Sequence, residues 1–290
     1  MSGSVRTLVV HTGGIGDFLM GCPALIRLAE EGPVELLGRP ERLDLAVAGG
    51  IATAAHDIDR VGFESVFGNP NRRLRRLLSP MDRVIIWMKD NEEIKRGVRR
   101  CGISDVRAFQ GIPPDNWKAH ASEYYMDCLG FQDAPPLRLP IAPHKTIKDV
   151  IIHPGSGSRQ KNWPFERFRS LAQALDEQGR SVWWCIGPAE EDSRIPHNGD
   201  ILQTESLEAL ARYLSAAHLY VGNDSGISHL AAAVGCRTIV IFGPTDPRVW
   251  APRGSNVTVV QGQPWPDVST VRCVSEMESE NWTKRSIVAL

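Results

Sequence analysis

The sequence lacks the features that mark several classes of protein. Its six cysteines are scattered and form no Cys-x-x-Cys pair, which argues against a zinc knuckle or a redox motif. Such scattered cysteines are typical of reduced, buried thiols in the cytosol. No apolar run approaches the ~20 residues needed to span a bilayer, and no apolar segment follows a basic start. We therefore expect neither a membrane-spanning helix nor a signal peptide.

An excess of charge of either sign is also missing. The 33 basic and 34 acidic residues give a formal net charge of −1, so the overall charge gives no indication of a nucleic-acid partner, and we expect none. A hydrophobic content of 42% with 23% charged residues is typical of a folded globular protein. A length of 290 residues favours two domains over one core. We place the linker in the proline-rich stretch Ala134 to Pro143, which gives domains 1–145 and 146–290.

The most informative stretch runs from Tyr220 to Pro247 and predicts a strand, a polar turn, a helix and a second strand. The turn, Gly222 to Gly226, contains Asn, Asp and Ser between its glycines, and an Ala-rich helix follows directly. A helix that begins there directs unpaired N–H groups and a positive dipole end at an anion, most often a phosphate. The alternative is that Asp224 or Ser225 only caps the helix.

A second polar loop precedes a helix near the start of the second domain. Pro154 to Pro164 is rich in Gly and Ser and carries Lys161 near its end. Backbone N–H groups and an ammonium together can bind phosphate. The loop does not match the Gly-x-x-x-x-Gly-Lys-Ser/Thr nucleotide motif, so an ordinary connecting loop remains the alternative.

The N-terminal segment combines a buried strand, a glycine loop and an acid. Arg6 to His11 predicts the strand, and Thr12 to Asp17 is the loop. A helix is predicted from Phe18, with Pro23 close to its start, where proline is tolerated. The glycines do not fit the dinucleotide fingerprint. Asp17 is predicted at the carboxyl end of strand one, where ligands bind in open α/β sheets; the alternative is a first-turn acid or cap.

The remaining elements alternate between strand and helix, which predicts two doubly wound, Rossmann-like α/β domains. The further predicted strands are Val34–Gly38, Ile51–Ile58 (loop or strand), Arg83–Met88, Asp149–His153, Ser181–Ile186 and one from Val257. The further predicted helices are Arg42–Ala48, Ala121–Leu129, Phe165–Gln178, Leu207–Ser215 and a terminal helix, Ser275–Leu290.

Two basic runs, Asn71 to Leu78 and Lys95 to Arg100, interrupt the first domain. In the first run, Leu74, Leu77 and Leu78 could face a core while the arginines 72, 73, 75 and 76 point outward. The ordinary interpretation is a solvated face. The alternative is an electropositive wall for an anionic substrate or a membrane surface.

Three separated motifs resemble glycosyltransferase family 9. They are Gly13-Gly-Ile-Gly-Asp17, His153-Pro-Gly-Ser with Lys161-Asn-Trp-Pro164, and Asp224-Ser-Gly-Ile-Ser-His229 with Phe242-Gly-Pro-Thr-Asp-Pro247. The family comprises the ADP-heptose:lipopolysaccharide heptosyltransferases. The resemblance implies a GT-B fold, in which two Rossmann-like domains face each other across a cleft. It assigns the acceptor to domain 1–145 and the nucleotide sugar to domain 146–290, and the last helix can pack back on the first domain.

The resemblance also implies an inverting, metal-independent transfer of a sugar, with heptose from ADP-heptose as the expected donor. Asp17 matches the position of the general base, and Lys161 matches the residue that stabilises the leaving diphosphate. Asp224 is expected to order its turn rather than to touch phosphate, and His229 could instead be a buried structural residue. The implied donor-binding residues are Ser156, Lys161, Glu191, Thr204, Glu205, Asp224, Ser225, Gly226 and His229, and the implied residues of the donor/acceptor loop are Gly13, Gly14 and Gly16.

No metal and no cofactor besides the nucleotide-sugar substrate is required by this scheme. The expected partners are that donor and a glycan or glycolipid acceptor, as in lipopolysaccharide core assembly. An anionic acceptor and peripheral contact with the inner face of the cell membrane remain open within a cytoplasmic location. Two other functions remain open: a nucleotide-sugar epimerase of GT-B fold, and a non-catalytic protein that binds nucleotide sugars.

Overall fold

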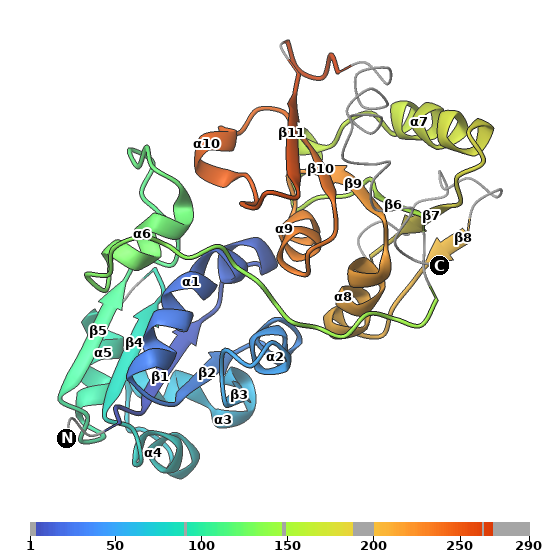
Figure 1. Cartoon of the computed structure of the whole chain (residues 1–290). Coiled ribbons are helices and arrows are strands. Elements are labelled where there is room, and N and C mark those ends of the chain that lie inside the picture. Colours follow the sequence, from blue (N-terminus) through green and yellow to red (C-terminus); the bar gives the residue numbers. More distant parts are fainter. Residues whose placement is uncertain (1–3, 90–91, 147–148, 188–199, 263, 269–290) are drawn as a thin grey trace. The chain divides into compact units, whose positions relative to one another are not determined.

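The structure, a computed structural model, describes residues 4–89, 92–146, 149–187, 200–262 and 264–268 (Figure 1). The chain divides into two compact units, Met1–Ile141 with Ser206–Glu208, and Ala142–Glu205 with Ala209–Leu290. The division at Ile141 and Ala142 lies inside the predicted linker. The predicted terminal helix from Ser275 lies outside the described residues.

The first unit contains a five-stranded parallel sheet in the order β3-β2-β1-β4-β5. His11, the last residue of β1, lies opposite Gly38 of β2 and Trp87 of β4. The elements are β1 (Thr7–His11), α1 (Ile15–Glu31), β2 (Val34–Gly38), α2 (Pro40–Ala48), β3 (Ala54–Asp57), α3 (Ile58–Val61), the 3-10 helix η1 (Phe63–Phe67), α4 (Arg72–Leu78), β4 (Arg83–Trp87), α5 (Glu92–Arg99), β5 (Asp105–Phe109) and α6 (Ala121–Asp127).

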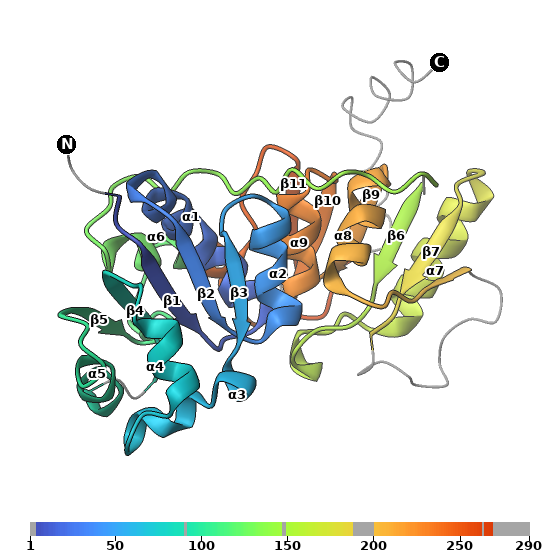
Figure 2. The same ribbon diagram turned by 90° about the horizontal axis from the view of Figure 1, so that it is seen from below.

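Helices cover both faces of this sheet, and all residues of β1 and β4 are buried. On one face, Leu8 and Val10 of β1 pack with Leu74 and Leu78 of α4 and with residues of α5. Figure 2 shows α4 and α5 on that side of the strands. On the other face α1 packs along α6. Strands covered on both faces are continuous apolar runs, which is why β1 and β4 are readily predicted.

The second unit contains a six-stranded parallel sheet in the order β11-β10-β9-β6-β7-β8. One of its faces packs against α7, through Phe168, Leu171 and Leu175. The elements are β6 (Val150–His153), the 3-10 helix η2 (Arg159–Lys161), α7 (Phe165–Glu177), β7 (Val182–Cys185), β8 (Asp200–Leu202), α8 (Leu207–Ala216), β9 (Leu219–Asn223), α9 (Gly226–Ala233), β10 (Thr238–Phe242), α10 (Pro247–Trp250) and β11 (Val257–Gln261).

Several details differ from what the sequence predicts, and the short helices α3, α4, α5 and α10 were not predicted. Helix α1 begins at Ile15 and not at Phe18. Pro23 therefore lies inside the helix, whereas the sequence predicted it near the helix start. The helix begins earlier because the Asp17 carboxylate accepts the N–H of Gly14 and so stabilises the first turn. Strands β5 and β8 were not predicted. Both are edge strands with polar or exposed residues, so neither is a continuous apolar run.

The two arginine runs have partly structural roles. The Arg75 side chain donates to the carbonyl of Pro70, and Arg100 donates to the carbonyls of Val66 and Gly68. These bonds satisfy backbone acceptors of one surface segment. Of the three predicted inward leucines, Leu74 and Leu78 are fully buried, whereas Leu77 is only partly buried.

Candidate active site

The first unit contains one candidate site, the segment of residues 12–17 between β1 and the first turn of α1, which we call the Asp17 loop. Asp17 lies in the first turn of α1, and its Oδ2 accepts the N–H of Gly14 at 2.9 Å. The side chain is half-buried, so a ligand at this edge of the sheet can reach it. The two roles considered for Asp17 are compatible, because one carboxylate oxygen stabilises the helix start and the other remains an acceptor.

Position 13 requires a glycine, because atoms of His11 and Asp17 occupy the space that a Cβ would need. A Cβ at this position would lie 2.8 Å from Cε1 of His11 and 3.0 Å from Cβ of Asp17. No real Cβ tolerates the shorter of these distances without a shift of the surrounding atoms. The glycine therefore lets the loop lie directly against His11 and the general-base candidate.

His11, which the sequence does not single out, lies beneath this loop. It is 3% exposed, packs against the rings of Phe18, Trp87 and Tyr125, and its Nε2 has no hydrogen-bond partner among the described residues. Burial, and secondarily the charge of Arg42, lowers its pKa from 6.5 to about 4. The imidazole is therefore neutral near pH 7.

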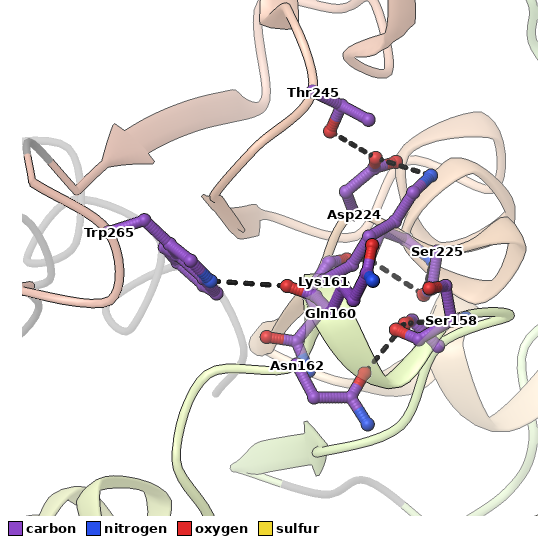
Figure 3. Close-up of polar contacts among 11 residues, drawn as sticks. Ser158, Gln160, Lys161, Asn162, Asp224, Ser225, Thr245 and Trp265 are labelled. Carbon is purple, nitrogen blue, oxygen red and sulfur yellow. Dashed lines mark hydrogen bonds and ion pairs between the residues drawn. The ribbon is translucent and has the colours of Figure 1, made fainter.

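The second unit contains another candidate site, which we call the Lys161 cluster and which consists of Lys161, Asp224 and Thr245. Lys161 Nζ lies 2.8 Å from Oδ2 of Asp224, and Thr245 donates its hydroxyl to the same oxygen at 2.7 Å (Figure 3). The Asp224 side chain is 7% exposed and that of Lys161 31%. Thus Asp224 fixes the lysine while the ammonium keeps donors directed at solvent.

Helix α9 begins beside Asp224 at the carboxyl end of β9. Ser225 is its N-cap, and the Ser225 hydroxyl accepts the N–H of Ser228. Of the two capping candidates, it is therefore Ser225 that caps the helix. The first helical residue, Gly226, is partly exposed, as is Ile227. Their N–H groups precede the helical hydrogen-bond pattern, which makes this helix start suited to an anion.

Asn223, which sequence reasoning missed, holds the loop that carries Lys161. Its Oδ1 accepts the N–H of Trp163 at 2.9 Å, and its Nδ2 donates to the carbonyl of Pro154 at 2.7 Å. One fully buried amide therefore joins both ends of the loop to β9. A buried asparagine directly before Asp224 in an apolar strand is the signal that could have revealed it.

Trp265 supports the same loop from another segment. Its Nε1 donates to the carbonyl of Gln160 at 3.1 Å (Figure 3). Its ring lies over Gly243, where a Cβ would lie 2.5 Å from ring carbons. Because Gln160 immediately precedes Lys161, this bond restrains the backbone of the lysine.

The other predicted donor-binding residues lie in several places. The Ser156 hydroxyl lies 2.6 Å from Oδ1 of Asn162 and 2.7 Å from the carbonyl oxygen of Ser158, so it closes the Lys161 loop. His229 is 8% exposed. Thr204 and Glu205 follow the edge strand β8, which is separated from β6 by β7. Glu191 lies outside the described residues.

An open depression lies at the carboxyl ends of β10 and β11. It has a volume of about 420 Å³ and is lined by Pro244, Thr245, Asp246, Pro247, Arg248 and Gln261. Thr245 joins it to the Lys161 cluster through the bond to Asp224. A volume of this size is within the range of small-molecule sites.

Across the described part of the chain, no group of three or more His, Cys, Asp or Glu side chains is arranged to hold a metal ion. The sequence Asp57-Ile-Asp59 has the spacing of an Asp-x-Asp metal motif. Asp57, however, caps α3, where its carboxylate accepts the N–H groups of Asp59 and Arg60.

Comparison with known sequences identifies related proteins. The family model described as "Glycosyltransferase family 9 (heptosyltransferase)" matches residues 120–278. Lipopolysaccharide heptosyltransferase 1 of Escherichia coli O18:K1:H7 (strain RS218 / NMEC) is 32% identical over 147 residues. The match covers 48% of this chain and 44% of that protein, so it spans less than half the length of this curated relative.

Solved structures extend the likeness over most of the chain. The E. coli ADP-heptose lipopolysaccharide heptosyltransferase II has a TM-score of 0.80 at 15% identity, covering 97% of this chain and 100% of that one. TibC, the dodecameric iron-containing glycosyltransferase of enterotoxigenic E. coli H10407, has a TM-score of 0.62 at 16% identity, covering 89% and 63%. At these identities the likeness concerns the fold, and the predicted GT-B class of two Rossmann-like units is confirmed.

Proposed function

Because the chain belongs to glycosyltransferase family 9, the heptosyltransferase family, we propose that it transfers heptose from ADP-heptose to a hydroxyl of the lipopolysaccharide core. The observation that carries this proposal is the Lys161 cluster beside the start of α9, within the region that matches the family. A cation and free backbone N–H groups on neighbouring elements are what a nucleotide diphosphate requires.

The leaving diphosphate is the group that Lys161 and α9 stabilise. An ammonium has three N–H donors, and the bond to Asp224 occupies one of them. The others can donate to phosphate oxygens, while the N–H groups of Gly226 and Ile227 approach from the helix start. These donors are in place before the bond breaks, so they stabilise the charge that develops on the leaving group.

Asp17 is the proposed general base. The acceptor hydroxyl attacks the anomeric carbon of the heptose from the face opposite the diphosphate, which inverts the configuration. The bond from the acceptor oxygen to that carbon forms as the bond to the diphosphate oxygen breaks, and ADP leaves. The hydroxyl proton passes to the Asp17 carboxylate, which accepts it late, when the proton has become acidic.

We also propose that the transfer needs no metal ion, because Lys161 and the backbone N–H groups supply the positive charge at the diphosphate. The iron is a property of TibC. In the described part of this chain, Asp57 of the Asp57-Ile-Asp59 sequence caps helix α3. Exhaustive treatment with EDTA should leave the transfer rate unchanged. A loss of rate that added Mg²⁺ or Fe²⁺ restores would contradict this part of the proposal.

The remaining donor contacts stay predictions. We assign Ser225 and Gly226 to the diphosphate, because they lie at the start of α9. Ser156 uses its hydroxyl within the loop, so we assign its contribution to the shape of the loop and its backbone. Thr204, Glu205, Glu191 and His229 are assigned to the nucleoside end of the donor and to the turn around it.

The acceptor and the location of the protein are proposed together. A nucleotide-activated sugar is a cytoplasmic substrate, so we propose a cytoplasmic protein that reaches a glycolipid acceptor at the inner face of the cell membrane. Arg72 and Arg76, which are exposed on α4, are available to an anionic acceptor or surface. Among the helices that the structure describes, each is too short or too polar to cross a bilayer.

The test is turnover by the purified protein with ADP-heptose and lipopolysaccharide that lacks core heptose. We expect heptose on the lipopolysaccharide and free ADP in equal amounts. Products from ADP-heptose alone would indicate an epimerase or hydrolase instead. Stabilisation by ADP without any turnover would indicate a binding protein; a ligand at 100 times its Kd raises stability by about 2.7 kcal/mol, which thermal unfolding detects readily.

A further inference from the structure

The peptide group between Gly13 and Gly14 lies at the centre of the Asp17 loop. Gly13 has no room for a Cβ, and a Cβ on Gly14 would lie 3.3 Å from Oδ2 of Asp17. Close packing therefore requires glycine at position 13, whereas a Cβ at position 14 would need only a small shift of the Asp17 side chain. The consequence is a backbone with unusual freedom to rotate, at the point where the general-base candidate needs a fixed partner.

Both ends of this one peptide group are bonded. Its N–H, from Gly14, donates to Oδ2 of Asp17 at 2.9 Å. Its carbonyl, from Gly13, accepts a short hydrogen bond from Nη1 of Arg42. Because a trans peptide is planar and its N–H and C=O point in opposite directions, the bond to the carbonyl fixes the direction of the N–H. Rotation of the peptide would break both bonds together.

Arg42 is itself held in place by the fold. It lies in the first turn of α2, which follows β2 directly, and β2 ends at Gly38 opposite His11 of β1. The buried neighbours Leu43 and Leu45 fix the helix to the core, and the Arg42 side chain is partly buried. The arginine therefore reaches the loop from a rigid element of the same unit.

We propose that Arg42 is a positioning residue for Asp17, acting through the Gly13–Gly14 peptide. This inference rests on the proposed function, in which Asp17 is the general base. The hydrogen bonds that a charged guanidinium donates to neutral acceptors are stronger than those of neutral donors. The neutral His11 beside the loop cannot replace that charge.

Removal of Arg42 should release the peptide and with it the Asp17 carboxylate. We expect Arg42→Ala to lower kcat for heptose transfer about tenfold to a hundredfold, since small misplacement of a reacting group has effects of this size. The KM for ADP-heptose should change less than about twofold, because the contacts proposed for the diphosphate, Lys161 and the start of α9, lie on other elements. Arg42→Lys, which keeps one charged donor, should recover most of the rate.

Arg39 provides the matched control. It is exposed, lies at the N-cap of the same helix, and contributes only its backbone carbonyl to α2. Arg39→Ala should therefore keep both kcat and KM. An equal loss of kcat in Arg39→Ala and Arg42→Ala would mean that the rate depends on the charge or the stability of α2, and not on the bond from Arg42 to Gly13.

A double-variant cycle tests whether Arg42 acts through Asp17. In an Asp17→Ala background, Arg42→Ala should have no further effect on the residual rate. A full additional loss there, or an unchanged kcat in Arg42→Ala alone, would overturn the inference. Wild-type protein without any transfer activity would instead count against the proposed function.

Amide hydrogen exchange decides the inference independently of activity. The Gly14 N–H should exchange faster in Arg42→Ala than in wild-type protein and Arg39→Ala, at equal Tm, because its acceptor Asp17 no longer faces it. Unchanged protection of Gly14 in Arg42→Ala would show that the peptide is held without the arginine, and the positioning role would be wrong.

Discussion

The Asp17 loop and the Lys161 cluster are built in different ways, although both follow central parallel strands. The Asp17 loop depends on the backbone: two glycines, one peptide group and the N–H of Gly14. The Lys161 cluster depends on side chains from three segments that meet at one carboxylate oxygen. A site of the first kind is sensitive to added atoms and to backbone rotation, whereas one of the second kind is sensitive to the removal of a partner.

The largest expected effect concerns the chemistry of the first loop. Asp17→Asn keeps an oxygen that can accept the Gly14 N–H but cannot take up a proton. We expect kcat to fall about a thousandfold, within the range for loss of a general base, with Kd for ADP and Tm nearly unchanged. Near-normal kcat would show that Asp17 only stabilises the start of α1.

The second expected effect concerns stability beneath the same loop. The pKa of His11 is about 4 in the folded protein, against an ordinary value of 6.5 in the unfolded chain, so the unfolded chain takes up the proton first as the pH falls. The contribution of His11 to the free energy of unfolding is therefore complete above pH 6.5. It is lost between pH 6.5 and pH 4, by about 3 kcal/mol.

His11→Phe removes this titration while keeping an aromatic ring among Phe18, Trp87 and Tyr125. Urea unfolding at pH 7 and pH 4 should show a smaller decrease in the variant than in the wild-type protein, by about 3 kcal/mol at most. Equal decreases in the two proteins would show that His11 is not the buried neutral group described above.

The third expected effect concerns the Lys161 cluster. Lys161→Ala should weaken ADP binding about tenfold to a hundredfold, as expected for one charge-assisted contact. It also leaves the buried Asp224 carboxylate with the Thr245 hydroxyl but without its cation, which should lower stability by about 1–3 kcal/mol. Calorimetry and urea unfolding measure the two quantities separately.

Arg159 is the matched control, because it lies in the same short helix η2 and is exposed. Arg159→Ala should leave both ADP affinity and stability nearly unchanged. If Arg159→Ala weakened ADP binding as much as Lys161→Ala, then general positive charge, and not the position held by Asp224, would account for binding.

The smallest expected effect concerns support from outside the cluster. Trp265→Phe keeps a ring over Gly243 but removes the Nε1 donor to the Gln160 carbonyl. We expect a two- to threefold loss of ADP affinity and about 1 kcal/mol of stability, the net value of one hydrogen bond. A larger loss than in Lys161→Ala would mean that the backbone of η2, and not the ammonium, dominates binding.

The parts of the fold that the sequence predicts are those that local chemistry determines. Strands such as β1, β4 and β10 are continuous apolar runs because both faces are covered, and Asp17, Lys161 and Asp224 follow such strands in polar loops. The edge strands β5 and β8 were missed because an edge strand need not be apolar.

The supporting residues could not be predicted for a different reason. Arg42, Asn223 and Trp265 each act on a loop distant in sequence, and their bonds depend on which strands are neighbours. Sheet order and register are tertiary facts: His11 lies opposite Gly38 only because β1 pairs with β2. Residue type alone gives no indication of these contacts, although a buried polar side chain in an apolar strand suggests one.

We propose that the Asp17 loop performs the chemistry and that the Lys161 cluster binds the leaving nucleotide. The most direct test measures ADP-heptose affinity and single-turnover rate at saturating donor for wild-type protein, Asp17→Asn and Lys161→Ala. We predict that Asp17→Asn loses rate at wild-type affinity, whereas Lys161→Ala loses affinity by at least about tenfold. Loss of affinity in Asp17→Asn with an unchanged rate, or wild-type affinity in Lys161→Ala, would contradict the account.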